Sequence, residues 1–130
     1  MADVYVRMVP NLFDVSAGET EEEFFTELQV EVASQMSCWD PTKQEYYQLK
    51  PSSNVRLYPS TFDPGTRTPI LVEVVISTYA YDDRVRGLED KLEAIAKCVC
   101  DCVPREKKPR RAEVVAVRFD PKRPGYWVAA

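Results

Sequence analysis

Histidine is absent from this chain of 130 residues. Without an imidazole, the protein cannot use a Ser–His or Cys–His nucleophilic pair, a histidine general base or a His-ligated zinc ion. Any chemistry must therefore rest on other groups.

An excess of positive charge is also missing. The chain carries 17 basic and 21 acidic residues, a formal net charge of −4, so it has no overall attraction to a phosphate backbone. No apolar run approaches the roughly 18 residues of a membrane span, and the first residues show no basic region followed by an apolar segment. We expect a cytoplasmic protein whose partners include neither membrane nor nucleic acid.

The overall composition is that of an ordinary globular protein, with 45% hydrophobic and 29% charged residues. A chain of this size buries roughly two-thirds of the surface that its unfolded form exposes, so it needs no metal or disulfide to fold. We expect a single domain over residues 1–130, with no cofactor.

Four cysteines are present, and three of them, Cys98, Cys100 and Cys102, are crowded near the end of a predicted helix. A disulfide scaffold would spread them along the chain. Because no CxxC spacing and no histidine accompany them, we expect free thiols that serve as small apolar residues, and no metal site.

The first half of the chain predicts a strand, a helix and a second strand. Residues 4–9 are short and alternating, as in a strand. Thr20 and Glu23 form a capping box, which predicts a helix from about residue 21 that ends before Asp40. Residues 45–49 are rich in strand-forming types and end before a proline. The helix should bury a stripe of apolar residues: Phe24, Phe25, Leu28, Val32 and Met36.

Residues 51–69 contain four prolines, one glycine and several Ser and Thr residues. This composition indicates a loop, in which residues 56–58 pair only briefly.

The second half repeats the same order. Residues 70–77 are apolar on both faces apart from Glu73, as in a covered central strand. One helix of about five turns should follow from Asp82 to Cys102, and residues 113–119 should form the last strand. The tail ends in apolar residues that a monomer has little reason to expose. The buried stripe of this helix should be Val85, Leu88, Leu92, Ile95, Val99 and Cys102.

The predicted fold class is thus α/β, with two consecutive strand–helix–strand units. Two architectures share this order of elements, one tautomerase-like and one ferredoxin-like. The order alone does not separate them.

Residues 70–77, the helix through Cys102 and residues 114–127 resemble the second half of proteins of the tautomerase superfamily, in particular those like macrophage migration inhibitory factor, uncharacterised bacterial members included. The resemblance rests on an aromatic–Asp pair, Phe119–Asp120, followed by Gly125-Tyr126-Trp127. Residues 57–62 are also similar to a stretch in uncharacterised members. The resemblance implies two βαβ units forming a sheet with both helices packed on one face. It also implies a homotrimer, in which the apolar tail pairs with a neighbouring subunit.

The chain departs from this family at its chemistry. Family enzymes use an N-terminal proline as the base, whereas this chain has Ala2. A primary amine at Ala2, freed by removal of Met1, would have a pKa of about 7.7 to 8.0 but would lack the rigid ring. The Tyr and Asn that many relatives carry on the last long strand fall on Val115 and Val117, which cannot polarise a carbonyl.

The candidate site residues are Ala2 as a weak catalytic base and four ligand-binding residues: Lys43, Ser77, Thr78 and Arg118. Lys43 lies close to a cationic position of the family. Solvated surface charge is the alternative for Lys43 and Arg118, and hydrogen bonding at a strand end is the alternative for Ser77 and Thr78.

Three functions follow as hypotheses. The preferred one is a tautomerase-like homotrimer with lost or altered activity that binds a small carboxylate or a protein partner. The second is an active tautomerase or isomerase that acts on a small keto or enol acid through the Ala2 amine. The third is a ferredoxin-like regulatory or RNA-binding module, which draws on the basic residues between 105 and 111. Against it, residues 70–76 lack the exposed aromatics of an RNA-binding sheet.

Overall fold

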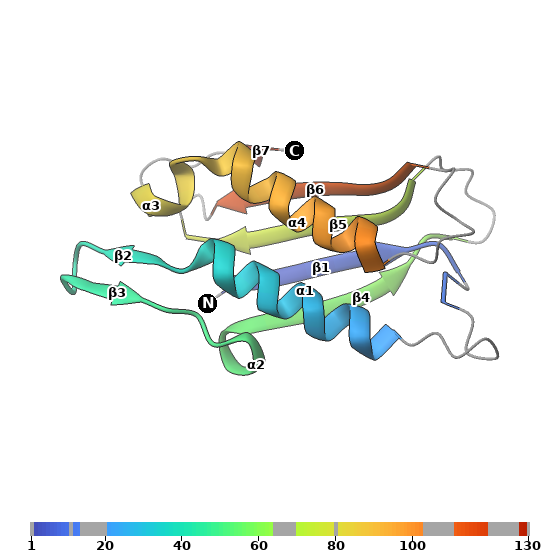
Figure 1. Cartoon of the computed structure of the whole chain (residues 1–130), viewed down its shortest axis with the longest axis horizontal. Coiled ribbons are helices and arrows are strands. Elements are labelled where there is room, and N and C mark those ends of the chain that lie inside the picture. The colour runs from blue at the N-terminus through green and yellow to red at the C-terminus, as the bar shows by residue number, and fades with distance from the viewer. Residues whose placement is uncertain are drawn as a thin grey trace.

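A mixed five-stranded sheet in the order β4-β1-β5-β6-β7 forms the centre of the computed structural model (Figure 1). The structure describes residues 2–10, 12–13, 21–63, 70–79, 81–102, 111–119 and 128–129, the strands over 111–119 and 128–129 by their backbone only. In sheet order the strands are Val55–Thr61 (β4), Ala2–Met8 (β1), Ile70–Thr78 (β5), Arg111–Phe119 (β6) and Val128–Ala129 (β7).

The strand directions divide the sheet into two βαβ units. β1 runs parallel to β4, β5 runs parallel to β6, and the central pair β1 and β5 is antiparallel. Helix α1 (Glu21–Met36) lies between β1 and β4 in the chain, and helix α4 (Leu88–Cys102) lies between β5 and β6. A ferredoxin-like sheet is built from split βαβ units, whereas here the two strands of each unit are direct neighbours. The prediction of an α/β fold with two such units is confirmed.

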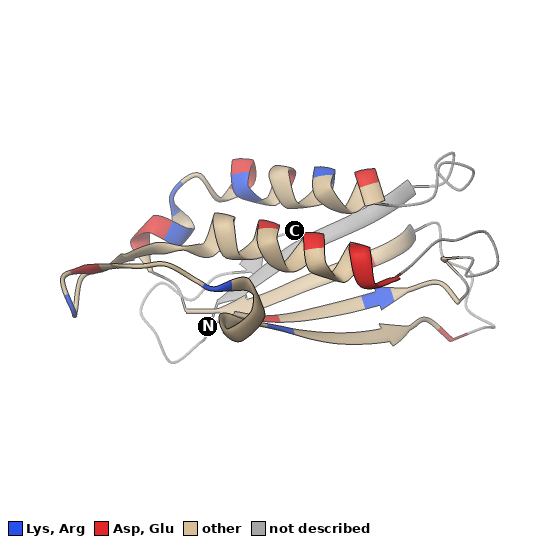
Figure 2. Ribbon diagram, turned by 60° about the horizontal axis from the view of Figure 1, so that its bottom comes forward, with Lys and Arg blue, Asp and Glu red and all other residues tan. Residues whose placement is uncertain are grey.

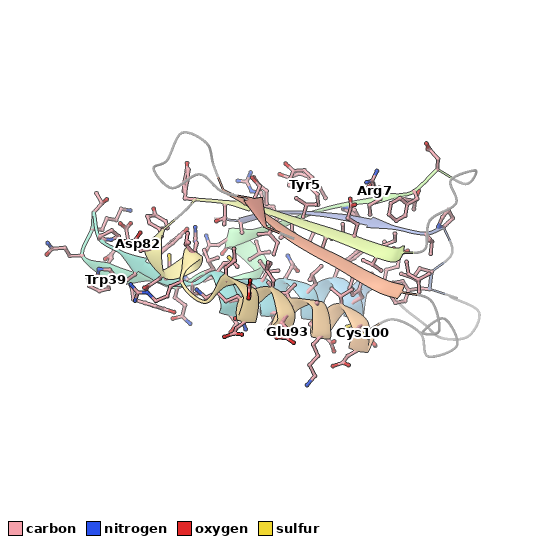
Figure 3. The ribbon with its side chains drawn as sticks, turned by 90° about the horizontal axis from the view of Figure 1, so that it is seen from above. Tyr5, Arg7, Trp39, Asp82, Glu93 and Cys100 are labelled. Atoms are coloured by element: carbon pink, nitrogen blue, oxygen red, sulfur yellow. The ribbon has the colours of Figure 1, made fainter. Side chains whose placement is uncertain are left out.

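Both long helices cover the same face of the sheet (Figures 1 and 3). Successive side chains of a strand point to opposite faces, and β1 alternates accordingly: Val4 and Val6 are buried under the helices, whereas Tyr5 and Arg7 are exposed on the other face. None of the helices in the described ranges is long and apolar enough to cross a membrane.

The predicted helical stripes are confirmed in the core. On α1 the buried members are Phe24, Leu28, Val32 and Met36, and on α4 they are Leu88, Leu92, Ile95 and Val99. Three further stripe residues, Phe25, Val85 and Cys102, are partly buried against this core. Glutamates 21–23 occupy the first turn of α1, where the helix dipole favours negative charge. Thr20 of the predicted capping box lies outside the described residues.

The second strand of the first unit differs from the prediction. Only Glu45–Tyr47 (β3) is extended in that region, and it pairs with Cys38–Asp40 (β2) in a hairpin separate from the main sheet. The strand beside β1 is β4, which was predicted to be mostly loop. β4 lies at the sheet edge, where Pro59 is tolerated. Only Val55 of β4 is buried. An edge strand that buries so little needs no alternation of apolar and polar residues, so its sequence does not look like a strand.

The second helix also differs from the prediction. A short helix at Asp82–Val85 (α3) ends before Gly87, whose φ of +65° is left-handed, and α4 begins at Leu88. Glycine adopts this conformation without steric cost, so the chain changes direction there. A four-residue helix, Pro51–Asn54 (α2), similarly precedes β4.

The end of the chain adds a short strand to the sheet. Val128 pairs with Arg118 and Ala129 with Val117, in antiparallel orientation. These two residues therefore pair within their own chain, and β7 forms one edge of the sheet. Tyr126, Trp127 and residues 105–110 of the predicted basic turn lie outside the described residues.

Replacing Gly87 with alanine should destabilise the protein by about 1 to 2 kcal/mol, the cost of a left-handed conformation for a residue with a Cβ. No atom lies within 4 Å of the position that this Cβ would take, so the cost comes from the backbone alone. Urea denaturation measures it. Gly87→Asn should lose less stability than Gly87→Ala, since asparagine tolerates the left-handed region. Equal stability of Gly87→Ala and wild type would contradict a left-handed conformation at residue 87.

Candidate functional site

Four of the five predicted site residues gather at one end of the sheet. Asp3 pairs with Ser77 across β1 and β5, and Ser77 pairs with Arg118 across β5 and β6. Continued by one residue, the antiparallel register sets Ala2 opposite Thr78. The backbone thus brings Ala2, Ser77, Thr78 and Arg118 into two adjacent rows.

Only two of these residues share the helix-covered face. Ala2 and Thr78 are buried, as expected for that face, whereas Ser77 alternates to the other side and is half-buried. The side chain of Arg118 lies outside what the structure describes.

Lys43 is not brought to the other four. It lies exposed in the turn between β2 and β3, where its backbone N–H and that of Thr42 donate to Asp40 Oδ1 over 3.3 and 2.9 Å. The hairpin projects beyond the end of the sheet (Figure 1). Lys43 is therefore a solvated surface charge, which was the alternative to a ligand-binding role.

A cation that the sequence reasoning missed, Arg84, lies at this end instead. Its side chain is fully buried, at 0% exposure. Its Nε donates to the carbonyl of Met36 over 2.7 Å, and its Nη1 donates to Thr78 Oγ1 over 2.7 Å and to the Tyr79 carbonyl over 3.2 Å. Met36 is the last residue of α1, so the guanidinium satisfies a carbonyl that the helix leaves free. Arg84 therefore joins α1, α3 and the end of β5.

The remaining nitrogen of this guanidinium is unsatisfied. Arg84 Nη2 is buried and has no hydrogen-bond partner, and no ion pair joins Arg84 to a carboxylate within the described ranges. An arginine stays protonated in proteins. Burial lowers the pKa of Arg84, while Cys38, Tyr81 and Tyr47 nearby act in the opposite direction. A buried charged donor without a partner is costly, and such a group is normally met by water or an anion.

The β2–β3 hairpin is attached to α3 through Asp83. The backbone N–H of Trp39 donates to Asp83 Oδ2 over 2.8 Å, and the Lys91 ammonium donates to the Asp83 carbonyl. Cys38 at the base of the hairpin is buried, and burial raises the pKa of its thiol, although the charge of Arg84 works against this. Burial likewise lowers the pKa of Lys91, and the charge of Asp83 opposes it.

Sequence reasoning missed Arg84 because arginine is rarely fully buried. Arg84 stands four residues before Leu88, so helical spacing sets it on the face of the predicted buried stripe. That spacing was the signal that could have found it. In the structure, Arg84 belongs to α3, which Gly87 separates from α4.

The opposite face of the sheet carries a different set of groups, and Figure 3 shows Tyr5 and Arg7 pointing away from the helices. Tyr5 stacks on Tyr58 with ring centroids 5.0 Å apart, and Arg7 Nη2 lies 2.8 Å from Glu73 Oε1. Asp3 Oδ1 on this side is buried without a hydrogen-bond partner.

Together these groups can hold an anion more readily than they can transfer a proton. The helix-covered end of the sheet offers a buried cation at Arg84, a hydroxyl at Thr78 and the start of β1 at Ala2. Apart from a main-chain amine at Ala2, none of these three groups is a base near neutral pH. A scan of family models, a search of curated proteins and a search of solved structures each found nothing that matches this chain.

Thr78→Val should destabilise the protein by about 1.5 to 3 kcal/mol, because it removes a hydrogen bond to a buried charged group without changing side-chain shape much. Urea denaturation of both proteins measures the difference. Ser77→Ala on the opposite face of the same strand is the matched control and should stay within about 0.5 kcal/mol of wild type. Equal losses in the two variants would argue against the Arg84 contact.

Proposed function

We propose that this protein is a tautomerase-superfamily-like scaffold that binds a small carboxylate-bearing molecule at Arg84 and lacks the proline-based chemistry of that superfamily. The observation that carries the proposal is the fully buried Arg84, whose Nη2 has no hydrogen-bond partner, next to Thr78 at the end of β5.

The strand order supports the scaffold part of the proposal. Two βαβ units with parallel strands meet through an antiparallel central pair, and both helices lie on one face. This is the arrangement that the resemblance implies. It also puts the first residue of β1 beside the last residue of β5, so that Ala2, Thr78 and Arg84 form one site.

A carboxylate accepts charge-assisted hydrogen bonds from a guanidinium. Burial strengthens such bonds because the surroundings have a low dielectric constant. Three hydrogen bonds of Arg84 already go to Met36, Thr78 and Tyr79, so only Nη2 is left to donate to a small ligand. We propose that the β2–β3 hairpin opens to admit it, since one backbone hydrogen bond from Trp39 ties β2 to α3.

Binding rather than turnover is the role that these residues favour. Ala2 replaces the proline that supplies the base, and Val115 and Val117 replace polar residues. An active tautomerase that uses the Ala2 amine is the alternative. Acetylating this amine would abolish any keto–enol activity under the alternative and would leave carboxylate binding in place under our proposal.

The uncovered sheet face supports a homotrimer as part of the proposal. Tyr5 and Tyr58 remain 49% and 43% exposed although they stack on each other. Among the described side chains of this face, Asp3 and Glu73 accompany Arg7 and Arg56, so both signs of charge are present. Mixed charges with aromatic rings suit another protein surface better than a phosphate backbone, which needs a net positive charge.

Pyruvate, used as a probe for small keto acids, should bind the wild-type protein saturably in isothermal titration calorimetry at constant ionic strength. Arg84→Lys should weaken this binding by about tenfold or more, because lysine keeps the charge but cannot hold Met36 and Thr78 and also donate to the ligand as the guanidinium does. Lys43→Met is the control, since Lys43 is exposed in the hairpin turn.

The proposal predicts that Lys43→Met binds as tightly as wild type. Loss of binding in Lys43→Met with retention in Arg84→Lys would return the carboxylate role to Lys43. Equal heats from pyruvate and chloride would show that no carboxylate site exists.

Light scattering on the untagged protein should give three times the 14.9 kDa mass of one chain. Tyr5→Glu, which adds a charge to the stacked tyrosines, should lower the mass towards that of one chain. Trp39→Glu is the matched control, because Trp39 is a similarly exposed aromatic on the hairpin. A wild-type monomer that binds single-stranded RNA would instead favour the nucleic-acid module.

A further inference from the structure

The groove between α1 and α4 lies on the side of the helices that faces away from the sheet. It has a volume of about 460 Å³, and its charged and thiol lining residues are Glu27, Glu31, Lys97, Cys98 and Asp101. Figure 2 shows that acidic positions recur along both helices. Three carboxylates against one ammonium give the groove a net negative charge, and it is separate from the Arg84 site.

Three metal-ligating side chains converge at one end of this groove. Cys98 and Cys102 are four residues apart on α4, which sets them on one side of the helix, one turn apart. Glu27 comes from α1, 75 residues earlier in the chain than Cys102, and its Oε2 accepts a hydrogen bond from the Cys102 thiol over 2.9 Å. The ligand atoms of all three residues lie within 4.8 Å of one another.

We propose that Glu27, Cys98 and Cys102 bind one thiophilic divalent metal ion, with zinc as the natural candidate. In a tetrahedral zinc site with Zn–S bonds of about 2.3 Å and Zn–O bonds of about 2.1 Å, ligand atoms lie about 3.5 to 3.8 Å apart. Small side-chain rotations bring the three atoms to this spacing. Three protein ligands leave the fourth position to water, as in zinc sites that stay open to a substrate.

The charges around the thiols support a cation at this place. Burial raises the pKa of Cys98, and Glu31, Glu27 and Asp101 raise it further, although a hydrogen bond with Cys102 has the opposite effect. Burial and the hydrogen bond with Glu27 raise the pKa of Cys102 strongly. Metal binding requires the two thiols to lose their protons, and a divalent ion would offset the negative charge of the resulting thiolates and of the nearby carboxylates.

No sequence motif predicts this site, because the third ligand is distant in the chain and neither histidine nor CxxC is present. The contact between the helices supplies it. A bound ion would link α1 of the first βαβ unit to α4 of the second, on the side of the helices that faces away from the sheet. Cys100, on the same helix, lines a different pocket with Asp90 and Glu93 and is not part of the cluster.

The test titrates the reduced, metal-free full-length chain with Co²⁺ and then with Zn²⁺. We expect one Co²⁺ per chain with thiolate-to-cobalt absorption, which Zn²⁺ abolishes. Cys98→Ser and Cys102→Ser should each weaken binding by more than about 100-fold, since loss of outer partners of a metal ligand already costs 10–100-fold. Glu27→Gln should weaken it by about tenfold or more, and Cys100→Ser should bind like wild type.

A second measurement on the wild-type chain does not depend on the folding of variants. Zn²⁺ should slow alkylation of Cys98 and Cys102, located by peptide mass spectrometry, and leave the rate at Cys100 unchanged. Absence of a thiolate–cobalt band, unchanged affinity in the Cys98→Ser/Cys102→Ser double variant, or equal alkylation with and without Zn²⁺ would each overturn the proposal. None of these results depends on carboxylate binding at Arg84.

Discussion

The guanidinium of Arg84 holds together the end of the molecule where the two βαβ units meet. It bonds to the last carbonyl of α1, to the hydroxyl of Thr78 at the end of β5 and to the carbonyl of Tyr79, and it does so from a fully buried position. An apolar residue at this position would remove these three hydrogen bonds. The same geometry leaves Nη2 without a partner, and this is the nitrogen that we propose binds the carboxylate of a ligand.

Because histidine is absent, only a few kinds of side chain can bind or react with a ligand. The structure brings such side chains together at two separate places. At the sheet end, a buried cation lies beside the first residue of β1, which suits recognition of a carboxylate. In the groove between the helices, two thiols and a carboxylate lie together among acidic residues, which suits a soft cation. Both places depend on contacts between the first and second halves of the chain.

Much of the fold could be predicted because apolar residues repeat at helical spacing along α1 and α4, and because residues 70–77 are apolar on both faces. β4 could not be predicted, because an edge strand buries few residues and the proline and polar residues of β4 are typical of a loop. Arg84 meets its acceptors only where α1 and β5 pack against α3, and Glu27 reaches the cysteines only through packing of α1 on α4. Such long-range contacts leave no pattern in a single sequence. Of the predicted site, Ala2 and Thr78 come together, whereas Lys43 points to solvent from the hairpin.

The most direct test of the central claim is nitrogen-15 NMR of arginine side chains in the wild-type protein. We expect the N–H protons of one guanidinium to exchange slowly with solvent because that group is buried. Loss of its signals in Arg84→Lys would assign them to Arg84. Its resonances should shift when pyruvate is added, whereas those of Arg7, exposed on the other face of the sheet, should not. Rapid exchange of every arginine side chain, or a protected Arg84 that does not respond to pyruvate, would contradict the account.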